Sequence, residues 1–396
     1  MAAVAETATK KPIPFDTKRL DRLMDEAGID VLVATSKHNV QYLLGGYRFF
    51  FFDTMDAIGT TRYLPAVVYQ KGKPENAAYV GCMMENFEKE LGKFWQPNLD
   101  LNVIGSKQTM GQVAKHIQKL GPVRRVAVES GFIPADGEAA LRSALSNVDI
   151  VDAVFPLERL RARKTPEEIG YLREASERVV DAMLTTFQKH CVPGATKLHV
   201  VEKLRQEEVL RELVFDYCLM TAGTSLNRAP SDQRLAAGDI ISLDSGGNYK
   251  GYIGDLCRMG IIGGKPDQEQ QDILGFVEEV QQAVSKPIRP GGRGGDVCEI
   301  AERMLDASPH RKYAHFMAHG MGLVSHEAPR LMNSPRFSYD GYDMERPLEP
   351  GMVVSIETTV QHPTRGFIKL EDTVIVTDTG NEALGDGGRG WNKAGG

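Results

Sequence analysis

The sequence predicts an α+β protein in two parts: a smaller α/β domain over residues 1–155 and a larger α+β domain over residues 156–396. The chain of 396 residues exceeds the length at which a single hydrophobic core stops growing. From Phe15 to about Val154, short apolar runs alternate with amphipathic segments, whereas the second part interleaves helices with two acidic hairpins. The change of pattern places the domain boundary near residue 155.

Each segment of the first part has the pattern of one element. TKRLDRLMDEAG and GEAALRSALS have helical periodicity, DVLVAT and RRVAVES are strand-like, and AVVYQKGKPENAAYVG is a hairpin that turns at Gly72 to Pro74. An aromatic cluster, Tyr47 with Phe49 to Phe52, is either a buried strand edge or the cap of a binding pocket, including the pocket of a neighbouring subunit. No metal-type motif occurs in this part.

A long helix opens the second part at KTPEE. Thr165 is its expected cap, Pro166 occupies the first helical position, and Glu168 completes a capping box. Further helices are expected around residues 197–213, 268–286 and 296–306. We expect GGRGG, near 291–295, to form a turn before a helix, and GDGGRG, near 385–390, to be a mobile tail.

Two segments of the second part resemble each other: GDIISLDSGGNYKGYIGDLCRM and GMVVSIETTVQHPTRGFIKLEDTVIV. Each has the pattern of a strand, a turn and a returning strand, with an acid on each arm. Asp244 and Asp255 lie on the first hairpin, and Glu357 and Glu371 on the second. Facing residues of antiparallel strands have Cβ atoms about 5 Å apart, so both pairs can converge. The similarity predicts a curved sheet with near two-fold symmetry and a metal site on its concave face.

These acids end apolar runs such as Ile240 to Leu243 and Val353 to Ile356, which favours burial over a solvated face. Four buried carboxylates repel one another by several kcal/mol even at an effective dielectric of about 20, so they require positive charge. One divalent ion would leave excess negative charge, whereas two would roughly neutralise the cluster. The sequence therefore predicts a pair of divalent ions.

Histidines supply the fifth ligand. His315, His319 and His326 fall within twelve residues of YAHFMAHGMGLVSHEAP, beside Gly320 and Gly322, where the backbone can approach closely. One imidazole with four carboxylates suits Mn, Co, Fe or Zn pairs, with Mn favoured, rather than a thiolate-bound zinc. The predicted metal ligands are Asp244, Asp255, His319, Glu357 and Glu371.

In these motifs the chain resembles the pita-bread family that includes methionine aminopeptidase, aminopeptidase P, prolidase and creatinase. The resemblance covers nearly the whole length and is nearest to two-domain Xaa-Pro peptidase-like members. It implies a pita-bread catalytic domain preceded by a creatinase-like N-terminal domain. The motifs that carry it are VLVATSKHNVQYLLGGY, RARKTPEEIGYLREASE, GDIISLDSG, GYIGDLCRM, AHGMGLVSHEAP, LEPGMVVSIE and IKLEDTVIV.

The resemblance also implies roles for the residues. Asp244 ligates one metal, Asp255 and Glu371 bridge or ligate both, and His319 with Glu357 completes the shell of one metal. His326 and His315 line the substrate side and stabilise the developing oxyanion. Two cations would lower the pKa of a shared water and polarise the carbonyl that it attacks. Of the two candidate proton shuttles, Glu357 and Glu371, the resemblance favours Glu357.

Three positions depart from the family pattern. Asn227 stands where family peptidases usually have histidine, Thr358 where they commonly have proline, and Lys369 where many have arginine. The favoured function is that of a dinuclear metal hydrolase acting on short Xaa-Pro peptides. The departures favour an alternative on the same scaffold, a small-molecule hydrolase or lyase like creatinase, ectoine hydrolase or dimethylsulfoniopropionate lyase. A binding module without chemistry and a protein without a site are opposed by the complete ligand set.

Composition limits the partners. A net charge of −6 without a basic run argues against nucleic acid or anionic membrane as a partner. No apolar stretch approaches the roughly 20 residues of a membrane span, and the N-terminus lacks the pattern of a secretory signal. Five scattered cysteines suit reduced thiols and a cytoplasmic location. We expect a small peptide or small-molecule substrate and, because related two-domain enzymes commonly dimerise, a homodimer.

Overall fold

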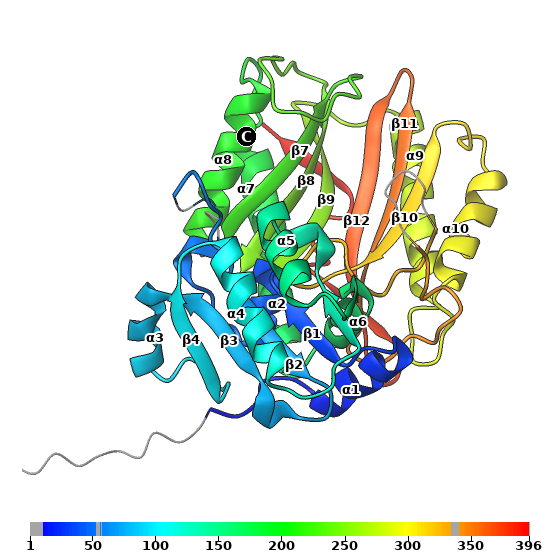
Figure 1. The fold of residues 1–396 in the computed structure, drawn as a ribbon. Helices are drawn as coiled ribbons and strands as arrows, with labels where there is room; N and C mark the ends of the chain where they lie inside the picture. The colour runs from blue at the N-terminus through cyan, green and yellow to red at the C-terminus, as the bar shows by residue number, and fades with distance from the viewer. Residues whose placement is uncertain (1–10, 53–55, 57, 334–339, 396) are drawn as a thin grey trace, which may run out of the picture. The chain divides into compact units, whose positions relative to one another are not determined.

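The computed structural model describes residues 11–52, 56, 58–333 and 340–395. The chain divides into two compact units, Met1–Arg161 and Ala162–Gly396. The boundary expected between residues 155 and 156 falls inside helix α6 (Val154–Ala162), shortly before the division between the units. Both units combine helices with a sheet, as the predicted α+β class requires (Figure 1).

The first unit contains a mixed sheet with strand order β4-β3-β2-β1-β5-β6 in the described part of the chain. The predicted hairpin is confirmed as β2 and β3, which pair antiparallel, whereas β1, β5 and β6 run parallel. The strand bounds are β1 Val31–Ala34, β2 Ala66–Gln70, β3 Ala78–Cys82, β4 Asn98–Val103, β5 Arg125–Val128 and β6 Asp149–Asp152.

Helices and short 3-10 turns connect these strands. The predicted first helix is amphipathic, and it buries Leu20, Leu23 and Met24 in the core. The helix bounds are α1 Thr17–Glu26, α2 Lys37–Leu43, α3 Asn86–Glu90, α4 Ser106–Gln118 and α5 Ala135–Ala144, and the 3-10 turns are η1 Phe50–Phe52, η2 Pro74–Asn76, η3 Met83–Glu85 and η4 Ser130–Phe132.

The aromatic cluster of the first unit is not a strand edge. Phe50–Phe52 form the 3-10 turn η1, in which Phe52 is buried and Phe50 is 61% exposed. Phe49 is buried beside them and contacts the ring of Tyr63. The expectation of a buried strand edge is therefore wrong, because the four rings follow a tight turn that buries Phe49 and Phe52 and exposes Phe50.

The second unit is built on a sheet with strand order β10-β11-β12-β9-β8-β7. The two halves of the sheet are built alike. In one half β7 lies outside the hairpin β8–β9, and in the other β10 lies outside the hairpin β11–β12. This confirms the two predicted hairpins. The bounds are β7 Val214–Ala222, β8 Ile240–Tyr249, β9 Tyr252–Ile262, β10 Ala314–Gly320, β11 Val353–His362, β12 Gly366–Val376, β13 Asn381–Leu384 and β14 Trp391–Ala394.

Helices cover each half of this sheet separately. Helices α7 (Pro166–Lys189) and α8 (Lys197–Leu210) pack on β7, β8 and β9, and α9 (Gln268–Ser285) and α10 (Asp296–Asp306) pack on β10, β11 and β12 (Figure 1). Thr165 and Glu168 form the predicted capping box at the start of α7. The helices leave the opposite face of the sheet to the acidic residues.

The glycine-rich segment near the C-terminus is ordered structure, so the expectation of a mobile tail is wrong. The carbonyl oxygens of Gly385 and Gly387 accept hydrogen bonds from the buried Arg258, and β14 then pairs in parallel with β9. These are contacts with distant parts of the chain, which local composition does not reveal. Among the described residues, no helix is at once long and apolar enough for a membrane span.

Candidate metal centre

The sheet of the second unit brings the four predicted acidic ligands to one face. Glu357 on β11 pairs directly with Glu371 on β12. On the other hairpin, Asp244 pairs with Cys257, and Asp255 pairs with Gly246 two positions away. Paired residues of antiparallel strands share a face, and so do residues two apart on one strand. All four carboxylates therefore point to the same side.

The two hairpins meet at the centre of the sheet, and this brings their acids together. Strands β9 and β12 pair through Cys257 and Glu371. His319 joins from β10, where it pairs with Ser355, the neighbour of Glu357 on the same face of β11. Five residues that are up to 127 positions apart in the sequence thus converge, and Asp244, Asp255, His319 and Glu371 are at least 97% buried.

His319 is oriented as a metal ligand. Its Nδ1 lies 3.2 Å from the Gly320 carbonyl oxygen, which sets Nδ1 as the protonated nitrogen and directs the lone pair of Nε2 to the acids. Nε2 lies 3.4 Å from Glu357 Oε1 and 3.8 Å from Glu371 Oε1, but it makes no well-aligned hydrogen bond. Asp255 Oδ1 is buried and also lacks a hydrogen-bond partner.

These orphaned atoms fit a cation. Ligand atoms of Asp255, His319 and Glu371 all lie within 4.8 Å of one another, a span that an ion holding ligands at about 2.0–2.2 Å can close by small side-chain movements. A buried polar atom without a partner costs about 1–3 kcal/mol, and coordination of an ion removes that cost. The residues present therefore suit a divalent metal.

A lysine ammonium lies among the same carboxylates. Lys369 Nζ is 2.6 Å from Asp244 Oδ2, 2.5 Å from Glu357 Oε2 and 2.7 Å from Glu371 Oε2. The side chain is only 3% exposed. Arg228, from the loop after β7, makes a further ion pair with Asp244. The cluster of four acids thus contains two cationic side chains of its own.

The pKa values reflect the crowding of charge. Burial, with the charges of Glu371 and Asp244, raises the pKa of Asp255 well above its usual value. Burial and the charge of Glu357 raise the pKa of Glu371 to about 7. Glu357 differs: burial alone would raise its pKa, but Lys369 and His319 together hold the pKa below its usual range. Glu357 therefore stays ionised, while Asp255 and Glu371 resist ionisation.

The acids form the floor of a cavity of about 340 Å³. That volume lies within the range of small-molecule sites. Besides the acids, polar and apolar side chains from β7, β10, β12 and the loops after β7 and β10 line the cavity: Tyr217, Leu219, Arg228, Met317, Ser325, His326 and Lys369. A site of this size and polarity suits a short, polar substrate.

The two histidines predicted on the substrate side are placed differently. The His326 ring stacks on His319, with centroids 3.8 Å apart and planes inclined by 12°, and it lines the cavity. Burial and the nearby His319 lower the pKa of His326 to about 3, which keeps it neutral at pH 7. His315 is exposed on β10 and is not among the lining residues, so its catalytic role stays a prediction.

The departures from the family pattern also have defined positions. The side chain of Asn227 is exposed and its Oδ1 accepts from the Ala229 N–H, whereas the next residue, Arg228, reaches the cavity. Thr358 points to the helix side, where its hydroxyl donates to Gln281 of α9. Of the three, only Lys369 contacts the predicted ligands.

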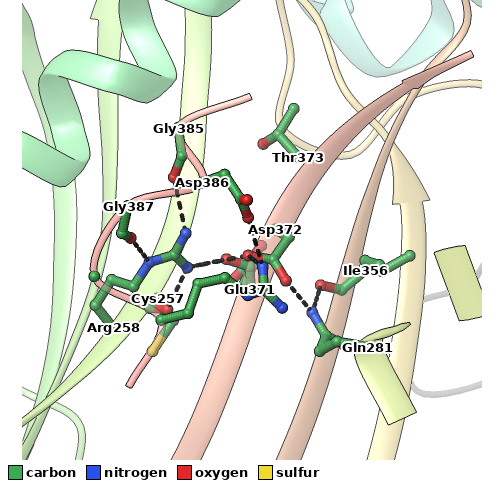
Figure 2. Close-up of polar contacts among 12 residues, drawn as sticks. Cys257, Arg258, Gln281, Ile356, Glu371, Asp372, Thr373, Gly385, Asp386 and Gly387 are labelled. Atoms are coloured by element: carbon green, nitrogen blue, oxygen red, sulfur yellow. Dashed lines mark hydrogen bonds and ion pairs between the residues drawn. The ribbon is translucent and has the colours of Figure 1, made fainter. Parts of the chain in front are cut away.

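Behind the acids, a buried network fixes the centre of the sheet (Figure 2). The Arg258 guanidinium is fully buried and donates to the carbonyl oxygens of Cys257 and Glu371, the one residue pair that joins β9 to β12. Asp372 pairs with Arg258 and accepts from Gln281, which also donates to the Ile356 carbonyl oxygen. Ligands on both hairpins are thus positioned through their backbones.

Sequence reasoning missed Arg228 and Tyr217, and it named Lys369 only as a departure from the family pattern, although the face on which Lys369 lies could have been found. Lys369 is two residues before Glu371 on the same strand, so strand periodicity alone places both side chains on one face. Tyr217 lies on β7 and Arg228 in the loop after it, and no local sequence pattern indicates that either side chain lies near the acids. Their placement depends on β7 pairing with β8.

Comparisons with known proteins agree with this geometry. The profile of metallopeptidase family M24 matches residues 170–378, and that of the creatinase/prolidase N-terminal domain matches residues 17–163. The chain is 26% identical over 382 residues to an uncharacterised peptidase of Bacillus subtilis, covering 93% of this chain and 96% of the relative. It is 26% identical over 379 residues to the Xaa-Pro dipeptidase of Pyrococcus furiosus, covering 93% and 96%.

Solved structures share the fold. The Xaa-Pro dipeptidase from Bacillus anthracis superposes with a TM-score of 0.77 at 22% identity, covering 95% of this chain and 98% of that one. The prolidase from Pyrococcus horikoshii gives a TM-score of 0.74 at 22% identity, covering 93% and 97%. These likenesses over nearly the whole of each chain show that the fold is shared.

Proposed function

Because the chain belongs to metallopeptidase family M24, we propose that it is a metal-dependent hydrolase of short Xaa-Pro peptides. The observation that carries the proposal is the convergence of Asp244, Asp255, Glu357 and Glu371 in the lining of one cavity, with His319 beside the two glutamates and with Asp255 Oδ1 and His319 Nε2 lacking partners. The relatives named Xaa-Pro dipeptidase support the substrate class. The cavity of about 340 Å³ has room for a small peptide.

The bound metal supplies Lewis acidity toward the substrate carbonyl and an activated water. The protein contributes the remaining groups. Glu357, ionised and part-exposed, can take a proton from the attacking water and deliver it to the leaving nitrogen. The neutral ring of His326 can donate a hydrogen bond to the developing oxyanion, and Arg228 can pair with a substrate carboxylate.

The donor set supports a divalent ion of the Mn, Co, Fe or Zn type, and we favour Mn because oxygen ligands dominate. The sequence predicts two ions on the ground that four carboxylates need about four positive charges. Lys369 and Arg228 alter that balance, because both cationic groups contact members of the cluster.

We also propose a cytoplasmic homodimer. The five cysteines are all free, which suits a reducing compartment. The first unit exposes large apolar side chains, including Phe50, Phe87 and Leu91 at 61–70%, and such side chains are candidates for an interface. Sedimentation velocity on the wild type and on Phe50→Ala tests this; a fully active wild-type monomer would contradict it.

A second candidate is a small-molecule hydrolase or lyase on the same scaffold. Asn227 stands where family peptidases usually have histidine, and its side chain lies outside the cavity lining. Among the residues that line the cavity, the histidine that the peptidase pattern places near the scissile bond is therefore missing.

Activity assays separate the two candidates. The metal-free protein should be reloaded with Mn, Co or Zn and tested on Ala-Pro, Gly-Pro and longer Xaa-Pro peptides, and in parallel on creatine, ectoine and sulfonium compounds. Metal-dependent release of the N-terminal residue from Xaa-Pro peptides is the expected result. Turnover of a small molecule alone would favour the second candidate. Activity that survives complete removal of metal would refute metal dependence for both candidates.

A further inference from the structure

The Lys369 ammonium divides the acidic cluster into two cation sites of different kinds. One carboxylate oxygen from each of three acids contacts Nζ: Asp244 Oδ2, Glu357 Oε2 and Glu371 Oε2, at 2.5–2.7 Å. The other oxygens of the two glutamates, Glu357 Oε1 and Glu371 Oε1, face His319 Nε2 at 3.4 and 3.8 Å. Each glutamate thus offers one oxygen to each side.

The two sides differ in what they lack. On the lysine side, a protonated amine with three donors meets three carboxylate oxygens, so its hydrogen-bonding capacity is fully used. On the histidine side, His319 Nε2 and Asp255 Oδ1 are buried without hydrogen-bond partners. The Ser355 hydroxyl donates to Glu371 Oε1 at 2.9 Å on this side, but it leaves Asp255 Oδ1 and His319 Nε2 without a partner. An ion is needed where acceptor atoms converge without enough donors, and that condition holds on the histidine side.

The charges give the same count. With all four carboxylates ionised, as metal binding requires, the acids carry four negative charges, and Lys369 and Arg228 in contact with them carry two positive charges. One divalent ion balances the remaining two negative charges. A second divalent ion would give the site an excess of two positive charges and would have to approach the buried ammonium.

From this partition we propose that the centre holds one divalent ion per chain, bound on the side of His319, Asp255, Glu357 and Glu371, and that Lys369 takes the place of a second ion. The proposal rests on the proposed metal dependence and deepens it. Lys369 lies two residues before Glu371 on β12, so its side chain is on the same face of the strand as this ligand. The fixed ammonium neutralises Asp244 without opening a second coordination shell.

The deciding experiment is the stoichiometry of metal bound by the full wild-type chain. Metal-free protein should be titrated with Mn²⁺ and, separately, with Co²⁺, then dialysed and measured by elemental analysis. We expect saturation at one ion per chain. In electron paramagnetic resonance, the Mn²⁺-loaded protein should give the six-line spectrum of isolated Mn²⁺. Two ions per chain, or the multi-line spectrum of a coupled pair, would overturn the inference but leave the proposed metal dependence standing. Binding of no ion would overturn both.

Two substitutions test the role of the lysine. Lys369→Ala removes the ammonium and opens space beside Asp244, so this variant should bind two ions per chain. Lys369→Arg keeps the charge and serves as the matched control, with one ion expected. Ethylammonium added to Lys369→Ala should compete with the second ion and return the stoichiometry toward one. A Lys369→Ala protein that is folded by circular dichroism yet binds one ion would contradict the assignment. Should that variant fail to fold, the wild-type stoichiometry and spectrum decide the question alone.

Discussion

Asp255 shows how one side chain depends on its surroundings. It is buried beside Glu371 and Asp244, and one of its oxygens has no hydrogen-bond partner. Without an ion the residue costs stability, because like charges are forced together. With an ion it contributes to binding. One substitution at this position is therefore expected to have opposite effects on stability in the metal-free and the metal-bound protein.

We predict that Asp255→Asn abolishes activity and weakens metal binding by at least about 100-fold, since one anionic ligand is lost. In the presence of a chelator, the free energy of unfolding of the variant should exceed that of the wild type by about 1 kcal/mol, because one of the mutually repelling carboxylates is gone. Isothermal titration calorimetry and urea denaturation measure the two effects. Full turnover by the variant, or tight metal binding, would refute the assignment of Asp255 as a ligand.

Glu208 gives a pH-dependent prediction away from the ligands. It is buried on α8 and accepts a hydrogen bond from the Ser245 hydroxyl; burial raises its pKa to about 8. The folded state therefore holds this proton more tightly than the unfolded chain, whose glutamates titrate near 4.3. Stability from this source is complete below pH 4 and is lost as the pH rises to about 8.

Glu208→Gln should remove that loss. Relative to the wild type, the variant should gain free energy of unfolding as the pH rises from 5 to 8, by an amount on the order of 3 kcal/mol. Urea denaturation at both pH values measures the change. Glu207→Gln is the control: burial would raise the pKa of Glu207, but Arg211 and His190 lower it, so no gain is expected over this interval. An unchanged difference between Glu208→Gln and wild type at both pH values would contradict the prediction.

At the scale of elements, the critical place is the junction of β9 and β12. These strands are joined in register through one residue pair, and the buried Arg258 donates to the carbonyl oxygens of both members of that pair. Further donations to Gly385 and Gly387 tie in the C-terminal segment (Figure 2). Arg258 therefore replaces ladder hydrogen bonds that the two halves of the sheet do not make.

Arg258→Met should destabilise the second unit by about 3–5 kcal/mol, the usual cost of removing one partner of a buried ion pair, here increased by carbonyl groups left without donors. Urea denaturation followed by circular dichroism measures this. Arg173→Met is the comparison, since Arg173 pairs with Glu382 at the surface and should change stability by only about 0–1 kcal/mol. Equal effects of both substitutions would show that the junction does not depend on Arg258.

The elements that sequence reasoning predicted well are those with local causes. Thr165, Pro166 and Glu168 set the start of α7 through contacts within one turn, and the structure confirms them. The hairpins follow from the turn residues and apolar strands around Asp244 and Glu357. The pairing of β9 with β12 has no such local cause.

The functional site shows the same division. The convergence of the acids and of His319 could be predicted, because spacing and flanking apolar residues mark them; their role as metal ligands stays a prediction. The approach of Lys369 Nζ to three carboxylates could not be judged from sequence, since it depends on how far β11, β12 and β8 bend toward one another. The ordered C-terminal segment escaped prediction for a similar reason: its partner, Arg258, lies well over one hundred residues earlier.

At the scale of the whole molecule, each unit has its own hydrophobic core. One tryptophan belongs to each: Trp95 is buried in the first unit and Trp391 begins β14 in the second. The predicted metal ligands all lie in the second unit. An ion that binds only the folded state stabilises the unit that holds it.

We therefore predict that metal shifts the unfolding reported by one tryptophan and not by the other. In Trp95→Phe, fluorescence follows Trp391, and a metal concentration of about 100 times Kd should raise the unfolding midpoint by roughly 5–10 °C, equivalent to about 2.7 kcal/mol. In Trp391→Phe, fluorescence follows Trp95, and its midpoint should not change. Equal shifts in both variants would show that the units unfold as one.

The ligands come from both halves of the second unit's sheet, two from the hairpin of β8 and β9 and the others from β10, β11 and β12. An ion bound by ligands from both halves also joins β9 to β12, which pair through a single residue pair. Loss of the ion would then increase local opening between β9 and β12 and admit proteases to buried strands. Metal supply would thus determine how long the protein persists in the cell as well as whether it acts.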